Sequence, residues 1–296
     1  MKRIIFKGAA VALVTPMNED GSINFDKLRE LVDFQIENGT DAIVSCGTTG
    51  EAATQSLEEH IEVVRKTVEF AAGRVPIIAG TGSNDTAFAI KTNEMAKDAG
   101  ADGLLVVTPY YNKTSQAGLI AHFTKIAENT DLPIILYNVP SRTGTAIKPE
   151  TYKELSKIDN IVAVKEANGD LSAVAKTAAL CGDDLMIYSG NDDQIVPIMS
   201  LGGLGVISVL SNVAPKLTHD ICQSCLDGDF AAARKMQLDN LGLINALFSD
   251  VNPIPVKEAL NMMSFNVGEC RLPLVRMSES GHNALRVQMQ KAGLVK

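Results

Sequence analysis

The sequence predicts a (β/α)8 barrel, the TIM-barrel fold, with a helical appendage at its C-terminal end. Eight short apolar runs alternate with amphipathic helical segments, and the alternation is complete by residue 230. Each run is nearly continuous in apolar residues, as expected of parallel strands that are buried on both faces. The chain has 296 residues, 46% of them hydrophobic, which suffices for the core of one such barrel.

The eight apolar runs are predicted to be the barrel strands. They span residues 9–15, 42–46, 76–80, 103–108, 133–138, 161–166, 185–189 and 205–209. Segments with helical periodicity lie between them, for example residues 25–37, 57–71 and 86–99. Ser56 and Glu59 form a capping-box pattern, which predicts that the second of these helices begins at residue 57.

An open, doubly wound sheet is the competing fold. It would require a GxGxxG motif after its first strand, and the nearest match, GTGSND at residues 80–85, lacks the third glycine. After residue 230 the pattern is helical only, over residues 230–248, 255–262 and 278–292. We therefore divide the chain into a catalytic barrel, residues 1–230, and a C-terminal helical extension packed on it, residues 231–296.

The composition argues against several classes of function. The net charge of −8 is spread along the chain without a basic cluster, so neither nucleic acid nor a membrane surface is an expected partner. No apolar run reaches the roughly 18 residues that span a bilayer, and residues 1–6 do not resemble a signal peptide. Five cysteines are sparse for a disulfide scaffold and predict a cytoplasmic protein. Cys222 and Cys225 form a lone CxxC, interpreted as two small apolar side chains on one helix face.

Lys165 is the residue that most suggests chemistry, because it interrupts an apolar strand near its C-terminal end. Alternation along the strand places Ile161, Ala163 and Lys165 on one face, and Val162 and Val164 on the other. If the first face lines the barrel, desolvation lowers the pKa of the amine and supplies a neutral nucleophile near pH 7. A structural lysine, paired with a neighbouring carboxylate, fits the spacing equally well.

Other polar residues follow the predicted strand ends, which is where active sites of this fold lie. A phenol at Tyr137 can pass protons to and from an attacking amine, and Arg142 can bind a carboxylate through two hydrogen bonds. The glycine-flanked Thr48 and Thr49 offer hydroxyl and backbone N–H groups to an anion. Taken singly, each residue also fits a structural role, such as a core tyrosine or a solvated arginine.

Metal catalysis is not expected from this sequence. The four histidines, His60, His122, His219 and His282, all lie in helical or C-terminal segments rather than at strand ends. Asp192 and Asp193 alone would make a poor site for a catalytic metal. No GxSxG motif of a serine hydrolase is present, and no organic cofactor is predicted.

Several motifs in order resemble the dihydrodipicolinate synthase family. They are GTTGE at residues 47–51, TPYYN at 108–112, YNVPSRTG at 137–144, KEA at 165–167, NPIPVK at 252–257 and RLPL at 271–274. The resemblance extends along essentially the whole chain. It implies condensation of pyruvate with L-aspartate 4-semialdehyde through a lysine Schiff base, as the entry step to diaminopimelate and lysine.

The resemblance also implies a role for individual residues. Lys165 would form the Schiff base, and Tyr137 would donate and accept protons. The remaining proposed residues are Thr48 and Tyr111 in a proton relay, Thr49, Ile207 and Gly190 around pyruvate, and Arg142 at the semialdehyde carboxylate. Tyr111 is expected to reach in from a neighbouring subunit, and the family expectation is a homotetramer built as a dimer of dimers.

Some members of the family are inhibited by lysine at a subunit interface. His60, Asn84 and Tyr110 match positions of that effector site. Leu57 stands where lysine-sensitive members have a histidine, and Phe88 stands where they have a glutamate. Without the carboxylate that pairs with the ammonium of the effector, weak or absent inhibition is expected.

Two other functions remain to be weighed. N-acetylneuraminate lyase and keto-deoxy sugar acid aldolases share the lysine and the tyrosine, whereas Arg142 and the Thr48-Thr49 pair favour the synthase. A catalytically silent barrel that acts as a binding protein is the second alternative. It is disfavoured because every proposed catalytic role is filled.

Overall fold

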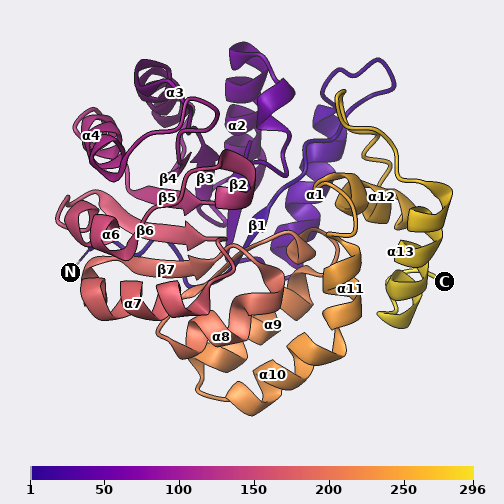
Figure 1. Cartoon of the computed structure of the whole chain (residues 1–296). Coiled ribbons are helices and arrows are strands. Elements are labelled where there is room, and N and C mark those ends of the chain that lie inside the picture. The colour runs from indigo at the N-terminus through magenta and orange to yellow at the C-terminus, as the bar shows by residue number, and fades with distance from the viewer. Residues whose placement is uncertain (1) are drawn as a thin grey trace.

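The computed structural model describes residues 2–296 and confirms the predicted barrel (Figure 1). Eight parallel strands pair in chain order, and the last strand pairs with the first to close the sheet. The strands are β1 (Gly8–Ala12), β2 (Ala42–Ser45), β3 (Ile77–Gly80), β4 (Gly103–Val107), β5 (Ile134–Asn138), β6 (Ile161–Glu166), β7 (Met186–Ser189) and β8 (Gly205–Ser208). The predicted runs for β1, β2, β4 and β8 extend past the strand ends, because their last residues already belong to the loops above the barrel. Those for β3, β5 and β7 begin one residue early, and the run for β6 matches its strand.

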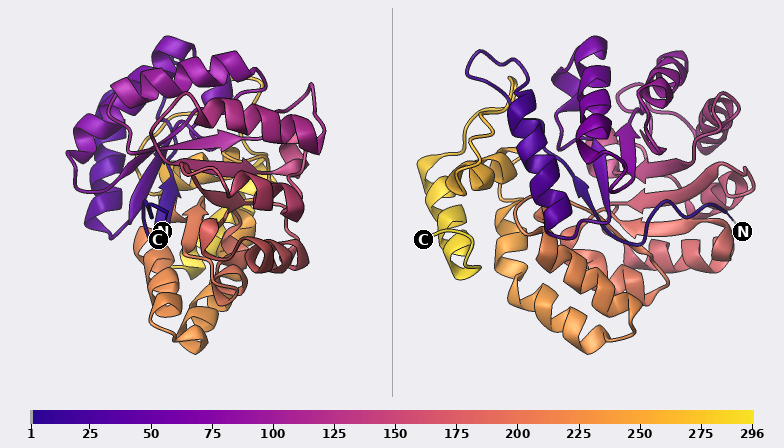
Figure 2. Two further views of the ribbon diagram at one scale, coloured as in Figure 1. Left: turned by 90° about the vertical axis from the view of Figure 1, so that its left-hand side faces the viewer. Right: turned by 180° about the vertical axis from the view of Figure 1, so that it is seen from behind.

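Helices surround the barrel and cover its outer face (Figures 1 and 2). In the barrel they are α1 (Phe25–Glu37), α2 (Leu57–Ala71), α3 (Thr86–Asp98), α4 (Gln116–Ala127), α5 (Pro140–Thr143), α6 (Pro149–Leu155), α7 (Leu171–Cys181), α8 (Ile195–Ser200) and α9 (Pro215–Leu226). The predicted capping box is present, since the Ser56 hydroxyl accepts from the Glu59 N–H while the Glu59 carboxylate accepts from the Ser56 N–H.

The apolar residues divide into an outer layer and a lumen. Side chains between strands and helices form the larger core, for example Ile43, Leu104 and Val164. The lumen holds a separate cluster of smaller extent: Phe6, Ala10, Ala12, Ala42, Val44, Ile78, Leu105, Ile135, Tyr137, Val139, Val162, Ala163, Tyr188 and Ile207. This division explains why the strand sequences are apolar on both faces.

The face predicted for the first residues of β6 is wrong. The pairing of β5 with β6 shifts between Ile134 and Ile135, so that Ile135 lies opposite Ala163 rather than opposite Val162. Ile161 therefore packs in the outer core, and Val162 joins Ala163 in the lumen. Strict alternation fails because the irregularity adds one residue to β6. Val164 and the residues after it follow the predicted alternation.

An aromatic pair fills the barrel at its N-terminal end. Phe6 precedes β1, and its ring stacks on Tyr188 with centroids 4.3 Å apart and planes 13° apart. The Tyr188 hydroxyl donates a hydrogen bond to the Phe6 carbonyl over 2.6 Å. Both rings are buried, so the lumen below the strand ends is filled by side chains.

The C-terminal part is helical, as predicted, but its first helix is divided. The structure has α10 (Phe230–Asp239), α11 (Leu241–Ala246), α12 (Ile254–Met262) and α13 (Glu279–Lys291). A continuous helix over residues 230–248 is therefore wrong. Asn240 ends α10 with a non-helical φ of −104° and ψ of 7°, and its side-chain amide donates to the Met236 carbonyl. This local hydrogen bond competes with continuation of the helix.

Helices α12 and α13 stand beside α1, at the side of the molecule away from Lys2 (Figures 1 and 2). Phe34 of α1 contacts Phe265 after α12, with ring centroids 4.8 Å apart. Val256 and Leu260 of α12 belong to the same core as the barrel helices. No helix within residues 2–296 combines the length and the apolar character that a bilayer crossing requires.

Candidate active site

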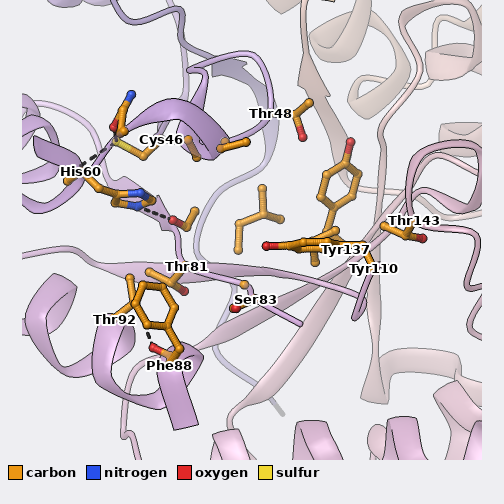
Figure 3. A pocket seen from close by; sticks show the side chains of 18 of the residues that line it. Cys46, Thr48, His60, Thr81, Ser83, Phe88, Thr92, Tyr110, Tyr137 and Thr143 are labelled. Atoms are coloured by element: carbon orange, nitrogen blue, oxygen red, sulfur yellow. Dashed lines mark hydrogen bonds between the residues drawn. The ribbon is translucent and has the colours of Figure 1, made fainter. Parts of the chain in front are cut away.

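A cavity of about 350 Å³ opens above the strand ends of β2 to β5. Thr48, Tyr110, Tyr137 and Thr143 lie on one side of it, and His60 and Phe88 on the other (Figure 3). Arg142 also lines the cavity. The predicted rim residues from three different strand ends thus face one space, which only a closed barrel brings together.

Lys165 lies in β6 with its amine inside the barrel, and only 6% of the residue is exposed. Burial is the main cause that lowers the pKa of its amine to about 8. Asp192 opposes this shift through its charge, whereas the guanidinium of Arg142 adds to it. A substantial neutral fraction is therefore available near neutral pH, which is what a nucleophilic amine requires.

Tyr137 is the residue opposite Lys165 on β5. The Lys165 Nζ lies 4.5 Å from the centroid of the phenol ring. Burial raises the pKa of Tyr137, while Arg142 and the hydroxyl of Thr48 hold down part of that rise. The phenol therefore stays protonated and can deliver its proton to an intermediate formed on the lysine, with Thr48 beside it (Figure 3).

Gly190, directly after β7, borders the lysine stem. A Cβ at Gly190 would lie 3.2 Å from Cγ of Lys165 and 2.7 Å from Cβ of Ala167, so only glycine leaves room for the lysine stem. The Gly190 N–H is already bonded to the Glu166 carbonyl over 2.7 Å. Ile207 is buried in the lumen cluster at the end of β8.

Arg142 follows the end of β5, as predicted, and lies in the one-turn helix α5. Pro140 begins this turn and Gly144 ends it in the left-handed conformation, at φ 67°. The guanidinium is exposed at the mouth of the cavity, and one of its N–H groups donates to the Asn252 carbonyl over 3.2 Å. Thr49 is buried, and its hydroxyl accepts from the Asn252 side chain.

Of the four proposed catalytic residues, Tyr111 alone has an exposed side chain. Its side chain is 92% exposed, whereas Tyr110 lines the cavity. The backbone of Tyr111 has a φ of 68°, a left-handed conformation that is uncommon for a bulky residue. A large aromatic side chain held outward in this way is free to enter a second molecule.

The proposed effector residues are only partly brought together. His60 and Tyr110 line the cavity, but Asn84 lines a separate pocket with Asn112 and His122. The His60 Nε2 bonds to the Gly80 carbonyl over 2.7 Å, and burial lowers the pKa of the imidazole. Leu57 and Phe88 also line the cavity, so this end of it is apolar.

Asp192 and Asn252 lie at the site, although the sequence predicts no catalytic or substrate-binding role for either of them. Asp192 was considered only as a metal ligand, yet its carboxylate is the anion that acts on Lys165. Its Oδ2 accepts from the Val209 and Leu210 N–H groups, and burial raises its pKa. Asn252 comes from the C-terminal part. The NPIPVK motif begins with this asparagine but does not show which residues it contacts.

The histidine, cysteine and carboxylate side chains of the described residues are dispersed through the fold. Within residues 2–296, no group of three or more His, Cys, Asp or Glu side chains is placed to hold a metal ion. Cys222 and Cys225 are buried on the inner face of α9, as expected of apolar helix positions.

Comparison with known proteins identifies the family of this chain. The model of the Dihydrodipicolinate synthetase family matches residues 5–292. The 4-hydroxy-tetrahydrodipicolinate synthase of Thermoanaerobacter sp. (strain X514) is 57% identical over 293 residues, covering 99% of this chain and 98% of that protein. The 4-hydroxy-tetrahydrodipicolinate synthase 1 of Clostridium acetobutylicum is 54% identical over 292 residues, covering 99% of each chain.

Solved structures show the same similarity. The chloride-inhibited dihydrodipicolinate synthase from Acinetobacter baumannii, in complex with pyruvate, superposes with a TM-score of 0.97 at 43% identity, covering 99% of this chain and 100% of that one. The enzyme from Cyanidioschyzon merolae with lysine bound gives a TM-score of 0.96 at 39% identity, with 99% and 100% coverage. This chain belongs to the dihydrodipicolinate synthetase family.

Proposed function

We propose that this protein condenses pyruvate with L-aspartate 4-semialdehyde to 4-hydroxy-tetrahydrodipicolinate. The observation that carries the proposal is a buried Lys165 with a lowered pKa, beside a protonated Tyr137. The names of the relatives favour this reaction over cleavage of sialic or keto-deoxy sugar acids. The first committed step to diaminopimelate and lysine is the corresponding metabolic role.

In the proposed reaction, the neutral amine of Lys165 attacks C2 of pyruvate. The carbinolamine loses water to give an iminium, and a proton leaves C3 to give an enamine. Tyr137 supplies the proton for the departing water and takes protons back, with Thr48 and Tyr111 completing the relay. Dividing the reaction into these steps avoids a free carbanion.

The enamine C3 then attacks the aldehyde carbon of the semialdehyde, and the aldehyde oxygen takes up a proton. The amino group of the semialdehyde next attacks the iminium carbon, which closes the ring and releases the Lys165 amine. Arg142 is assigned to the carboxylate of the semialdehyde, since its guanidinium stands at the mouth of the cavity. Thr49, Ile207 and Gly190 are assigned to pyruvate.

The proposal extends to the assembly and its location. A homotetramer built from two dimers would let the exposed Tyr111 of one subunit complete the site of another. All five cysteines carry free thiols, which suits the reducing cytoplasm.

Trapping with borohydride in the presence of pyruvate tests the proposed chemistry. Reduction of the iminium should leave a carboxyethyl group on Lys165, identified by peptide mass mapping. Lys257 is the internal control, because it is equally buried but paired with Glu51. Modification of Lys257, of any other lysine, or of none would reject Lys165 as the nucleophile. Cleavage of N-acetylneuraminate in place of semialdehyde condensation would reject the proposed substrates.

A further inference from the structure

Asn252 joins two parts of the proposed site from outside the barrel. It precedes α12 in the C-terminal part of the chain, and 6% of the residue is exposed. Its side chain contacts Thr49 after β2, and its backbone contacts Arg142 in α5. One residue of the helical part thus reaches both the residue assigned to pyruvate and the residue assigned to the semialdehyde.

The side-chain contact sets the direction of the Thr49 hydroxyl. The Asn252 Nδ2 donates to Thr49 Oγ1 over 3.0 Å, in a buried hydrogen bond. A hydroxyl that accepts from an amide keeps its own proton free to donate elsewhere. The proton of Thr49 is thereby available for a carboxylate oxygen of bound pyruvate.

The backbone contact is chemically separate from the side chain. The Asn252 carbonyl accepts from Nη2 of Arg142 over 3.2 Å. This bond limits the rotation of an otherwise exposed guanidinium and does not depend on the side chain at position 252. A substitution there should therefore disturb the two contacts unequally.

The segment that carries Asn252 is fixed to the same strand-end loop as Thr49. Lys257, in the first turns of α12, donates to the Glu51 carboxylate over 2.8 Å and to the Thr15 and Glu269 carbonyls. Both side chains of the Lys257–Glu51 pair are almost fully buried, at 2% and 1% exposure. Glu51 lies two residues after Thr49, so the anchor and the Asn252 contact act on one loop.

We propose that Asn252 is a positioning residue that orients the Thr49 hydroxyl toward pyruvate and steadies Arg142 through its carbonyl. This inference rests on the proposed function. It assigns the C-terminal part a direct share in pyruvate binding, in addition to its packing on the barrel.

The test measures the pyruvate concentration that half-saturates borohydride trapping at Lys165. In Asn252→Ala we expect this concentration to rise about 3- to 10-fold, the range for loss of one neutral hydrogen bond. In Asn252→Asp, which keeps the shape, we expect a rise of about 10-fold or more, because the new carboxylate takes the Thr49 proton and repels pyruvate. The KM for the semialdehyde should stay within about twofold in both variants, since the backbone bond to Arg142 remains.

A double-mutant cycle separates positioning from a merely structural effect. In a Thr49→Val background, Asn252→Ala should add little to the pyruvate half-saturation, because the partner hydroxyl is already gone. Asn245→Ala is the matched control, since Asn245 is an exposed asparagine of α11. It should leave both constants unchanged. If Asn252→Ala does not fold, Asn252→Leu, which is uncharged and close to asparagine in shape, supplies that arm of the cycle.

Three outcomes would overturn the inference. They are an unchanged pyruvate half-saturation in the folded variants, effects that add fully to those of Thr49→Val, and equal increases for both substrates. Wild-type protein is trapped in parallel. If wild type gains no carboxyethyl group on Lys165, the proposed function itself fails. If wild type is labelled and the Asn252 variants match it, only the role of Asn252 fails.

Discussion

At the scale of single residues, the surroundings of Lys165 show how the barrel favours a neutral amine. The lumen removes water from the amine, and the small residues Ala163 and Gly190 leave it space. Desolvation disfavours the ammonium form and so favours the reactive form. The same burial of the lysine also lowers the free energy of unfolding. Both the lowered pKa and the lost stability can be measured.

The rate of iminium formation should depend on pH with an apparent pKa near that of Lys165. Because burial lowers this pKa to about 8, the amine becomes protonated as the pH falls below that value. We expect kcat/KM for pyruvate to decrease about tenfold per pH unit in the acid limb. Stopped-flow trapping between pH 6 and pH 9 would check it. A limb that stays flat down to about pH 6 would contradict a lysine with this pKa.

Lys165→Met should make the protein more stable and inactive. The pKa falls from 10.5 in the unfolded chain to about 8 in the fold. The unfolded state therefore binds more protons between these pH values, and the native lysine costs up to about 3 kcal/mol below pH 8. The gain in unfolding free energy should be full at pH 7 and shrink as the pH rises toward 10.5. Denaturant unfolding measures it, with the exposed Lys291→Met as control. A lower free energy of unfolding for Lys165→Met than for the wild type at pH 7 would contradict this prediction.

At the scale of elements, the buried Lys257–Glu51 pair joins α12 to the loop after β2. Lys257→Met would leave the Glu51 carboxylate buried without its ammonium partner. We expect the free energy of unfolding to fall by about 3–5 kcal/mol. Thermal or denaturant unfolding would check this. The double variant Glu51→Gln/Lys257→Met should recover part of the loss, because the unpaired charge is removed.

The exposed ion pair between Lys157 and Glu154 is the matched comparison. Lys157→Met should change stability little, since solvent screens that pair. If Lys257→Met were as mild as Lys157→Met, the pair would not be the anchor that we infer. Each variant replaces a lysine by methionine and removes one positive charge. The two therefore differ mainly in how deeply the ion pair is buried.

The apolar wall formed by Leu57 and Phe88 predicts the response to lysine. An ammonium group entering this end of the cavity would find neither a carboxylate from Phe88 nor a polar partner from Leu57. We expect weak or absent inhibition in initial-rate assays, and increased sensitivity in Phe88→Glu. Strong inhibition of the wild-type enzyme at sub-millimolar lysine would contradict this expectation.

At the scale of the whole molecule, Tyr111 predicts that the functional unit contains more than one chain. Tyr111→Phe and Lys165→Ala should each be nearly inactive alone. If Tyr111 serves a neighbouring subunit, mixed dimers contain one complete site, and about one site in four should recover after random reassembly. Coupled assays of refolded mixtures would measure this. Recovery no greater than the sum of the separate variants would contradict a shared site.

The features that depend on local sequence pattern could be predicted from the sequence. The alternation of strands and helices, together with the position of Lys165, was enough to place Tyr137 and Thr48 on one rim. The register shift at Ile134 between β5 and β6 could not be predicted from local pattern, because the sequence of a single strand does not determine which residues it pairs with. Nor could local pattern show the bond from Asn252 to Thr49, which joins residues 203 positions apart. Contacts of that span are set by the packing of the finished fold.

The stacked pair of Phe6 and Tyr188 also decides the route of the substrates. Because these rings fill the lower end of the lumen, we expect reactants, products and water to reach and leave Lys165 from above the strand ends. In the proposed reaction pyruvate bonds to the buried Lys165, whereas Arg142 at the mouth binds the semialdehyde, so we expect pyruvate to enter first. The water expelled during iminium formation must leave before the second substrate occupies the entrance. The closed lower end of the lumen thus determines the order in which the substrates enter and the water leaves.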